Sequence, residues 1–256
     1  MEKRHWKQKY TTFPPLPCPR CGGALRFDKS SLAERETAYS LRGRSEGNWT
    51  LYDIETRFVC FLVCEVVWCG EIVAVSGISS EQEEPVYGDV DQETDVFTYY
   101  YPKSMIPAPY PFRLSKKLSE ECRVDLANAF RLLWNDHAAC SNKLRMFVEH
   151  LLDQLGVPRE IPKKPKNLDS RIEKFGEDHP QYMQILHALR HVGNTGSHTA
   201  KTTFDDVVQC FILVQAVIKA LIDREMDEIY KTAKKLTEKY ERSLLIRKNK
   251  NRAYVG

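Results

Sequence analysis

The pattern of hydrophobic and polar positions divides the chain into two halves of different character. Before residue 107, apolar and polar residues alternate in segments such as "NWTLYDIETRFVCFLVC" and "EIVAVSGIS", which is typical of half-buried β-strands. After residue 114, apolar residues recur every three or four positions with little Gly or Pro, which predicts helices. Between the two halves, the three prolines of Met105–Phe112 prevent a regular helix or strand. The pattern predicts an α+β protein, with a small β module over residues 1–113 followed by an antiparallel helical bundle over residues 114–256.

The same periodicity predicts where the helices begin and end. The first should begin near Ser119, because the two glutamates after it favour the positive end of a helix. The others are expected from about Ala139 to Leu155, from Asp169 or Ser170 to Phe175, from Pro180 to about His191, and from a cap at Asp205 or Asp206 to Leu245. The last helix is apolar on all sides up to Leu221 and amphipathic beyond it. Its first part should therefore lie inside the bundle, and its second part should lie outside or project.

Composition narrows the class of protein. Of 256 residues, 42% are hydrophobic and 29% are charged, which is the balance of a globular protein with a proper core. The longest apolar stretch is far shorter than the roughly 18 residues needed to cross a bilayer, and we identify no secretory signal. We therefore expect a cytoplasmic protein without membrane contacts. The net charge of +3 is too small to indicate nucleic-acid binding by itself, although basic residues cluster at Met1–Tyr10, Ile161–Lys166 and Ile246–Arg252.

Eight cysteines in a cytoplasmic chain should be reduced thiols, so their spacing indicates metal binding or burial. Cys18 and Cys21 in "PCPRCGG" form a knuckle whose turn directs two thiolates at one metal. Cys64 and Cys69 are a second candidate pair, and a glycine follows Cys69 in "CGE" as one follows Cys21. Cys60 is the competing candidate ligand, but it lies in a strand-like run. We expect Cys18, Cys21, Cys64 and Cys69 to form a closed, structural, zinc-ribbon-like Zn site, with reduced metal-free thiols as the alternative. The remaining cysteines are expected to be small core residues: Cys122, Cys140 and Cys210.

The segment "LRHVGNTGSH" is a candidate for chemistry, since it places Arg190, His191, Asn194 and His198 between two predicted helices. An ordinary helix end also explains these residue types, because Arg and His favour the negative end of a helix and Gly-Asn often stops one. In a functional interpretation, an arginine holds a phosphate while a histidine transfers a proton, which lets a ribose 2′-hydroxyl attack its own phosphate without a metal. A zinc site of His187, His191 and His198 is a third interpretation, and it lacks a nearby carboxylate or cysteine.

Three pieces of the chain together resemble a bacterial family of domains of unknown function in the HEPN superfamily (higher eukaryotes and prokaryotes nucleotide-binding domains). They are the module "CPRCGG … LVCEVVWCGEIVAVSG", the bridge "PAPYPF", and "SNKLRMFVEHLLDQLGV … LRHVGNTGSH". The resemblance extends from about Pro17 to Ile229, and relatives occur attached to restriction-enzyme subunits. It implies a HEPN-like bundle that commonly forms a homodimer. Many HEPN proteins are metal-independent RNases of toxin–antitoxin, abortive-infection and CRISPR-linked defence, with an arginine–histidine motif that meets its copy across the dimer interface.

Carried over to this chain, Arg190 is the motif arginine, His191 its polar follower and His198 the motif histidine. Seven residues separate Arg190 from His198, one more than the motif's upper limit. The resemblance implies an RNA-cleaving effector in anti-phage defence, in which Arg190 and His191 bind RNA or nucleotide, His198 is the acid or base, and Asn194 orients. The alternative is a non-catalytic, zinc-stabilised dimeric module that binds nucleotide or assembles with other defence or restriction proteins.

Overall fold

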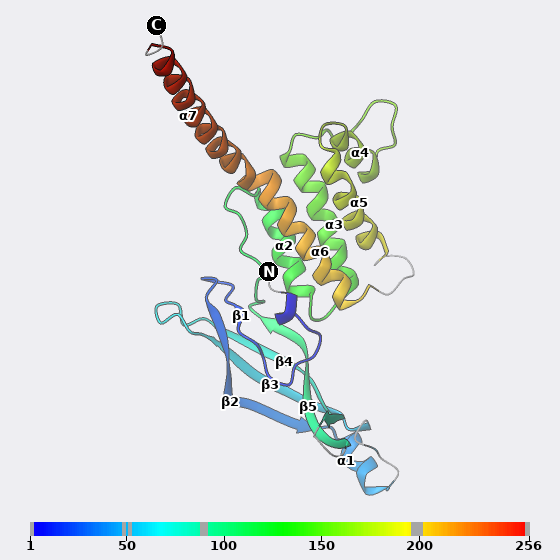
Figure 1. The fold of residues 1–256 in the computed structure, drawn as a ribbon. Coiled ribbons are helices and arrows are strands. Elements are labelled where there is room, and N and C mark those ends of the chain that lie inside the picture. Colours follow the sequence, from blue (N-terminus) through cyan, green and yellow to red (C-terminus); the bar gives the residue numbers. More distant parts are fainter. Residues whose placement is uncertain (1–2, 48–49, 51–52, 88–91, 196–201, 254–256) are drawn as a thin grey trace.

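The computed structural model describes residues 3–47, 50, 53–87, 92–195 and 202–253. An antiparallel sheet forms the first half and helices form the second, which confirms the α+β class (Figure 1). The strands lie in the order of the sequence: β1 (Leu16–Pro17), β2 (Ala24–Glu36), β3 (Thr56–Cys64), β4 (Ile72–Tyr87) and β5 (Gln92–Ile106). A 3₁₀ turn, η1 (Lys3–His5), precedes the sheet, and a short helix, α1 (Ala38–Ser45), lies in the connection from β2 to β3.

One face of the sheet is buried, and the N-terminal segment covers part of it. Buried positions of β3 alternate with more exposed ones, as expected for a strand with one face in the core; they are Phe58, Cys60, Leu62 and Cys64. Tyr10 forms a β-bridge with Tyr100 of β5. The ring of Phe13 packs against those of Phe58 and Tyr100, with centroids 6.2 Å away in both cases. These aromatic contacts hold the N-terminal segment against the sheet.

The helical half is a set of packed helices with one long projection. The elements are α2 (Glu120–Leu132), α3 (His137–Gln154), α4 (Leu168–Asp178), α5 (Pro180–Thr195), α6 (Phe204–Val217), the π-helical segment η3 (Ile218–Asp223) and α7 (Glu225–Ala253). Figure 1 shows α7 extending away from the other helices, as the amphipathic pattern beyond Leu221 predicts. Within the part of the chain that the structure describes, no helix has the length and apolar character needed to cross a membrane.

Polar side chains begin four of these helices, because each accepts a hydrogen bond from a backbone N–H of the first turn; they are Ser119, Asp136, Asn167 and Thr203. Ser119 is the predicted start of α2. The predicted cap of α6 is wrong, since Thr203 is the N-cap and Asp206 completes a capping box three residues later. Gly156, with a φ of +78°, follows α3 as expected of a residue that ends a helix.

The prediction of one continuous last helix is also wrong. α6 passes into η3, and Arg224 then adopts a left-handed conformation with a φ of +54° before α7 begins. At this break the Ser115 hydroxyl donates a hydrogen bond to the Asp223 carboxylate at 2.5 Å. Ser115 belongs to the linker between the sheet and the helices, so the contact joins segments far apart in the sequence. A periodic apolar pattern does not reveal such a contact.

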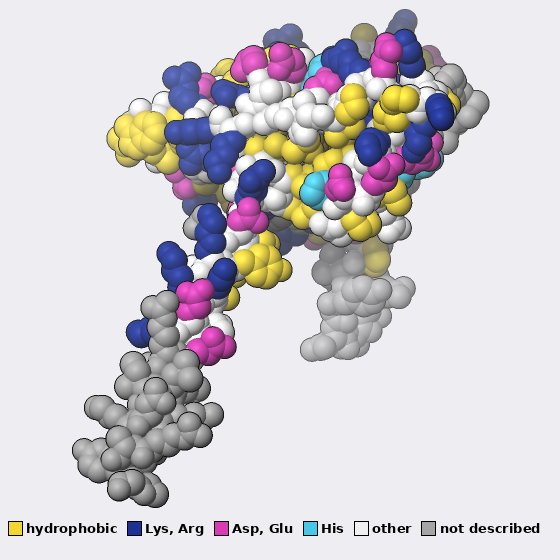
Figure 2. Space-filling view, turned by 90° about the horizontal axis from the view of Figure 1, so that it is seen from above, with side chains coloured by type: hydrophobic (Ala, Val, Ile, Leu, Met, Phe, Trp, Pro, Cys, Tyr) yellow, Lys and Arg dark blue, Asp and Glu magenta, His cyan; other side chains and the backbone are white. Residues whose placement is uncertain are grey.

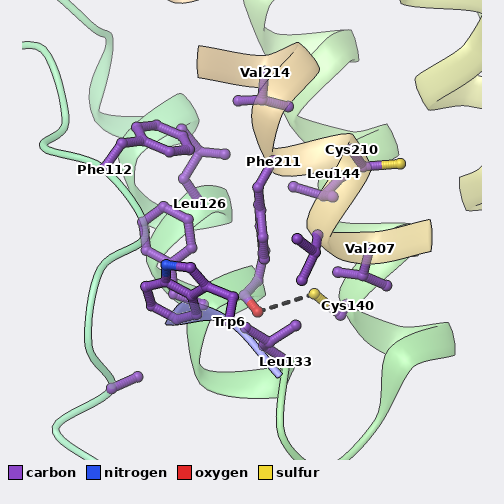
Figure 3. Close-up of a cluster of buried hydrophobic side chains, with 14 of the residues drawn as sticks. Trp6, Phe112, Leu126, Leu133, Cys140, Leu144, Val207, Cys210, Phe211 and Val214 are labelled. Carbon is purple, nitrogen blue, oxygen red and sulfur yellow. Dashed lines mark hydrogen bonds between the residues drawn. The ribbon is translucent and has the colours of Figure 1, made fainter. Parts of the chain in front are cut away.

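The sheet and the helices share one hydrophobic core. Figure 3 shows its part in the bundle, where side chains of α2, α3 and α6 lie beside Trp6 of the N-terminal segment. The rings of Trp6 and Trp134 stack at 6.0 Å, and Trp134 packs against Phe204 at 5.4 Å. The Cys140 thiol donates a hydrogen bond to the carbonyl oxygen of Ala129 at 3.0 Å (Figure 3). The three cysteines expected in the core are all buried: Cys122, Cys140 and Cys210.

Candidate functional site

Two tight turns carry the four cysteines expected to bind a metal. In the first, after β1, the Gly22 amide donates to the carbonyl oxygen of Cys18 at 2.9 Å. The amide of Gly23 donates to the Sγ atom of Cys21 at 3.3 Å. Gly22 has a φ of +78°, a backbone conformation that glycine adopts without steric penalty. The residues between and after the two cysteines therefore form the turn that the "CPRCGG" spacing predicts.

The second turn follows β3 and has a similar construction. The amides of Cys69 and Gly70 both donate to the carbonyl oxygen of Val66, at 2.8 and 3.0 Å, and Gly70 has a φ of +53°. Cys64 is the last residue of β3 and pairs with Leu25 of β2. Because β2 and β3 are antiparallel neighbours, the end of β3 lies beside the turn that precedes β2. Strand pairing thus brings the two cysteine turns together.

The four sulfur atoms form one compact group, which we call the cysteine group: all lie within 4.8 Å of one another. The Sγ atoms of Cys18 and Cys69 are 3.8 Å apart, and those of Cys21 and Cys64 are 3.5 Å apart. A tetrahedron of sulfurs with metal–sulfur bonds of about 2.3 Å has edges of about 3.8 Å. Cys60 lies outside this group and is buried on the strand, as predicted. The group could therefore hold a metal ion.

The thiols of the cysteine group have different surroundings. The hydrogen bond from the Gly23 amide lowers the pKa of the Cys21 thiol. Burial raises the pKa of the Cys69 thiol and raises the pKa of the Cys64 thiol to about 12. Cysteine binds a metal as the thiolate. The surroundings of Cys64 and Cys69 favour the protonated thiol, so a metal cation at this position would supply the positive charge that stabilises their thiolates.

A second polar cluster lies between α4 and α5. The Arg190 guanidinium pairs with the Asp169 carboxylate, with 2.7 Å between Nη2 and Oδ1, and the Nδ1 atom of His187 lies 3.3 Å from the same oxygen. His191 completes the cluster, with its Nε2 atom 3.5 Å from Arg190 Nη2 and its ring 6.2 Å from that of His187. The side chains of Arg190 and His187 are 19% and 24% exposed. One carboxylate therefore pairs with a guanidinium and lies close to an imidazole, at a surface that solvent still reaches.

The helix that carries this cluster does not end at His191, where the sequence predicts a stop. α5 continues through Gly193 and Asn194. Gly193 allows close packing of two helices and does not form a turn. A Cβ added at this position would lie 2.5 Å from the Cβ of Arg145 and 2.9 Å from the carbonyl oxygen of Ser141, both on α3. The close approach of α3 and α5 at a residue without a side chain explains why Gly-Asn does not break the helix.

The structure describes only part of the predicted catalytic set. Arg190 and His191 lie in the cluster, and Asn194 occupies the last turn of α5, where it is half-buried. His198 lies outside the described residues, so the predicted Arg190–His198 pair does as well. Among the residues that the structure describes, the four cysteines form the one group with metal-ligand spacing, and His187 and His191 belong to no such group.

The sequence interpretation missed Asp169 as the partner of Arg190. The sequence pattern indicates only that a short helix begins at Asp169 or Ser170. Asp169 does lie in the first turn of α4, and its N-cap is Asn167. The packing of α4 against α5 decides which basic residue this carboxylate contacts, and local spacing carries no signal for that choice.

Comparison with known proteins gives one match in each half of the chain. Residues 7–105 match a family model described as a domain of unknown function (DUF8608), and residues 127–243 match one described as a domain of unknown function (DUF4145). The first match covers the sheet almost to the end of β5, and the second runs from within α2 into α7. No curated protein and no solved structure matches the chain. The chain is thus similar to two families of domains of unknown function, one in its sheet and one in its helices.

Proposed function

We propose that this protein is a HEPN-like, RNA-binding effector that cleaves RNA without a metal at the polar cluster of α5. The observation that carries the proposal is that the Arg190 guanidinium, paired with Asp169, and the His187 imidazole lie side by side at a partly exposed surface. A guanidinium binds a phosphate, and an imidazole transfers a proton near neutral pH. The HEPN resemblance of the sequence supports action in the cytoplasm, as a homodimer, in bacterial anti-phage defence.

In this reaction the ribose 2′-hydroxyl loses its proton to a base and attacks the adjacent phosphorus. The bond from phosphorus to the 5′-oxygen breaks, and that oxygen takes a proton from an acid, which leaves a 2′,3′-cyclic phosphate and a 5′-hydroxyl. Arg190 stabilises the charge on the phosphate, His198 serves as acid or base with the His187 imidazole in the other role, and Asn194 orients them. Asp169 does not exclude a phosphate from Arg190, because a guanidinium has five N–H donors in a planar fork and can bind two anions.

We also propose that the cysteine group binds zinc and that this part of the fold is zinc-ribbon-like. Four thiolates are a typical ligand set for structural Zn²⁺, and the sulfur distances of 3.5 and 3.8 Å fit a tetrahedron around it. Four protein ligands leave no open coordination position. The ion would therefore stabilise the turns at the ends of β1 and β3 and take no part in RNA cleavage.

A non-catalytic binding module is the second candidate function, and two contacts favour it. Asp169 neutralises the charge of Arg190, and Gly193 has a packing role against Arg145 that is independent of any ligand. In this alternative the bundle forms a homodimer, and the protein binds nucleotide or another protein of a defence or restriction complex. Light scattering of the purified protein measures the dimer that both functions require.

An RNA cleavage assay separates the two functions. Purified protein is incubated with total RNA and a chelator, and its metal content is measured afterwards to verify that the cysteine group has not lost its ion. If the proposal is right, the wild type leaves 2′,3′-cyclic phosphate ends, and neither Arg190→Ala nor His198→Ala does. Arg159→Ala is the matched control, because Arg159 also pairs with an aspartate, Asp153, at 2.7 Å. Absence of cleavage by the wild type, or cleavage that survives in both variants, contradicts the proposal and favours the binding module.

A further inference from the structure

We propose that a basic cleft between the cysteine turns and the beginning of α2 binds single-stranded nucleic acid, with its phosphates on arginine and lysine side chains and a base on Trp68. The cleft has a volume of about 910 Å³. One wall is the first cysteine turn together with Trp68 of the second, and the other is the linker around Arg113 with the first turns of α2. The choice of RNA as the natural ligand rests on the proposed function.

Positive charge is concentrated in this cleft. It is lined by four basic side chains and one acidic one: Arg20, Arg113, Lys116, Arg123 and Glu120. Arg20 pairs with Glu71 at 2.5 Å, and Arg123 lies 3.8 Å from Glu120. Arg113 and Lys116 are exposed and form no ion pair with any residue that the structure describes. These two cations are therefore available to an anionic ligand. The small net charge of the whole chain does not reveal this local concentration of positive charge.

Lys and Arg side chains also gather visibly at this end of the molecule. In Figure 2 they lie beside a hydrophobic cluster at the left, the end at which Figure 1 places the turn between β3 and β4. A positively charged groove raises the local concentration of a polyanion and speeds its association. Positive charge alone does not distinguish a nucleic acid from an acidic protein. An aromatic side chain in the wall of the cleft favours a nucleic acid, because bases can stack on it.

The aromatic wall is Trp68, which is 78% exposed although tryptophan is normally well buried. It lies between Cys64 and Cys69, in the turn whose ends are fixed by the cysteine group. Its neighbour Val67 is 99% exposed, so nothing in the described chain covers these two side chains. Exposed aromatic rings next to basic side chains bind single strands, because every base has a face that can stack and every nucleotide has a phosphate. A duplex hides its base faces, which is why we assign a single strand.

Fluorescence anisotropy of labelled oligo-U and oligo-dT tests this inference on the full-length, metal-loaded protein. The charge reversals Arg113→Glu and Lys116→Glu together should weaken binding more than tenfold. They should also reduce the slope of log affinity against log salt by about 1.4, since each contacted phosphate contributes about 0.7. Trp68→Ala should weaken binding roughly tenfold and remove the quenching of tryptophan fluorescence by the oligonucleotide. Equal affinity for oligo-U and oligo-dT would mean that the cleft binds single strands of either kind. Stronger binding of oligo-U would mean that its ligand is RNA.

The control is Lys234→Glu with Lys235→Glu on α7, which makes the same change of charge on exposed residues far from the cleft. Metal content and thermal unfolding verify that each variant is folded. The inference is wrong if the cleft variants bind as the wild type does, if the α7 control weakens binding equally, or if polyglutamate competes as well as the oligonucleotide does. Cleavage of RNA by the wild type, together with unchanged oligonucleotide binding in the cleft variants, would leave the proposed function standing without this inference. Loss of binding in the cleft variants, together with no cleavage by the wild type, would do the reverse.

Discussion

The cysteine group and the α5 cluster are held together in different ways. Each cysteine pair lies in a single turn, and the two turns meet because β2 and β3 are neighbours in an antiparallel sheet. In the α5 cluster, by contrast, Asp169 comes from α4 while Arg190 and His187 come from α5, and the packing of two helices brings them into contact. Short spacing is therefore enough to recognise the whole first site, whereas in the second it indicates Arg190 and His191 but not their partner Asp169.

Breaking the cysteine group should have the largest effect. Cys18→Ser should abolish metal binding and unfold much of the sheet region, because structural zinc contributes about 10–16 kcal/mol to the folding of small zinc domains. Elemental analysis and circular dichroism of the purified variant measure the two losses. Cys60→Ala is the matched control on β3, and it should keep the metal while losing a little stability. Loss of the metal in Cys60→Ala, or full metal content in Cys18→Ser, would contradict the ligand assignment.

Replacing two arginines of the bundle, Arg171 and Arg190, should distinguish a structural arginine from one that is free to serve a function. Arg171 is buried and donates to the carboxylate of Asp153 and to the carbonyl oxygens of Glu149 and Val157, at 2.7, 3.2 and 3.0 Å. Arg171→Ala should lower the free energy of unfolding by about 2–4 kcal/mol, because it removes a buried donor from the carbonyl oxygens of Glu149 and Val157, while Asp153 keeps its pair with Arg159. Arg190→Ala should lower it by about 1 kcal/mol or less, since its partner is partly exposed. Urea unfolding measures both values, and equal losses would make Arg190 a structural residue.

The packing role of Gly193 predicts an intermediate effect. Gly193→Ala should destabilise the protein by about 1–3 kcal/mol, because the added methyl would overlap the stem of Arg145 and the backbone of α3. Gly156→Ala is the comparison, since Gly156 has a φ of +78° and open space around it, so the cost of about 1 kcal/mol is backbone strain alone. Thermal unfolding of the two variants gives the order. If Gly193→Ala is neutral or stabilising, Gly193 serves a role other than packing.

The smallest expected effect is a response of the bundle to acid. Burial lowers the pKa of His137 below its ordinary value of 6.5. Below that pH the unfolded chain takes up a proton that the folded chain resists, so the stability contributed by the neutral His137 is complete above 6.5 and declines as the pH falls. His137→Gln should flatten this part of the stability curve, measured by urea unfolding at several pH values between about 5 and 8. An unchanged slope in the variant would mean that other groups cause the decline.

Local signals were reliable where a single turn or a single strand was involved. The alternation in "TRFVCFLVC" located β3 and its buried face, and Ser119 began α2 as predicted. The same signals failed where a distant segment intervened. The Gly-Asn pair in "VGNTG" predicts a stop near His191, yet α3 packs so closely against Gly193 that α5 continues. At Arg224 the last helix breaks beside a contact between Ser115 and Asp223 that no local pattern contains.

The sequence by itself determined the α+β class, the four cysteines with metal-ligand spacing, and the helix that carries Arg190. These features depend on spacing within a few residues, where backbone geometry leaves few alternatives. Only the tertiary structure decided that Asp169 pairs with Arg190 beside His187, that Gly193 is a packing residue, and that basic side chains and Trp68 line one cleft. Each of these contacts joins elements that are separate in the chain, and the packing of the whole fold sets which surfaces meet.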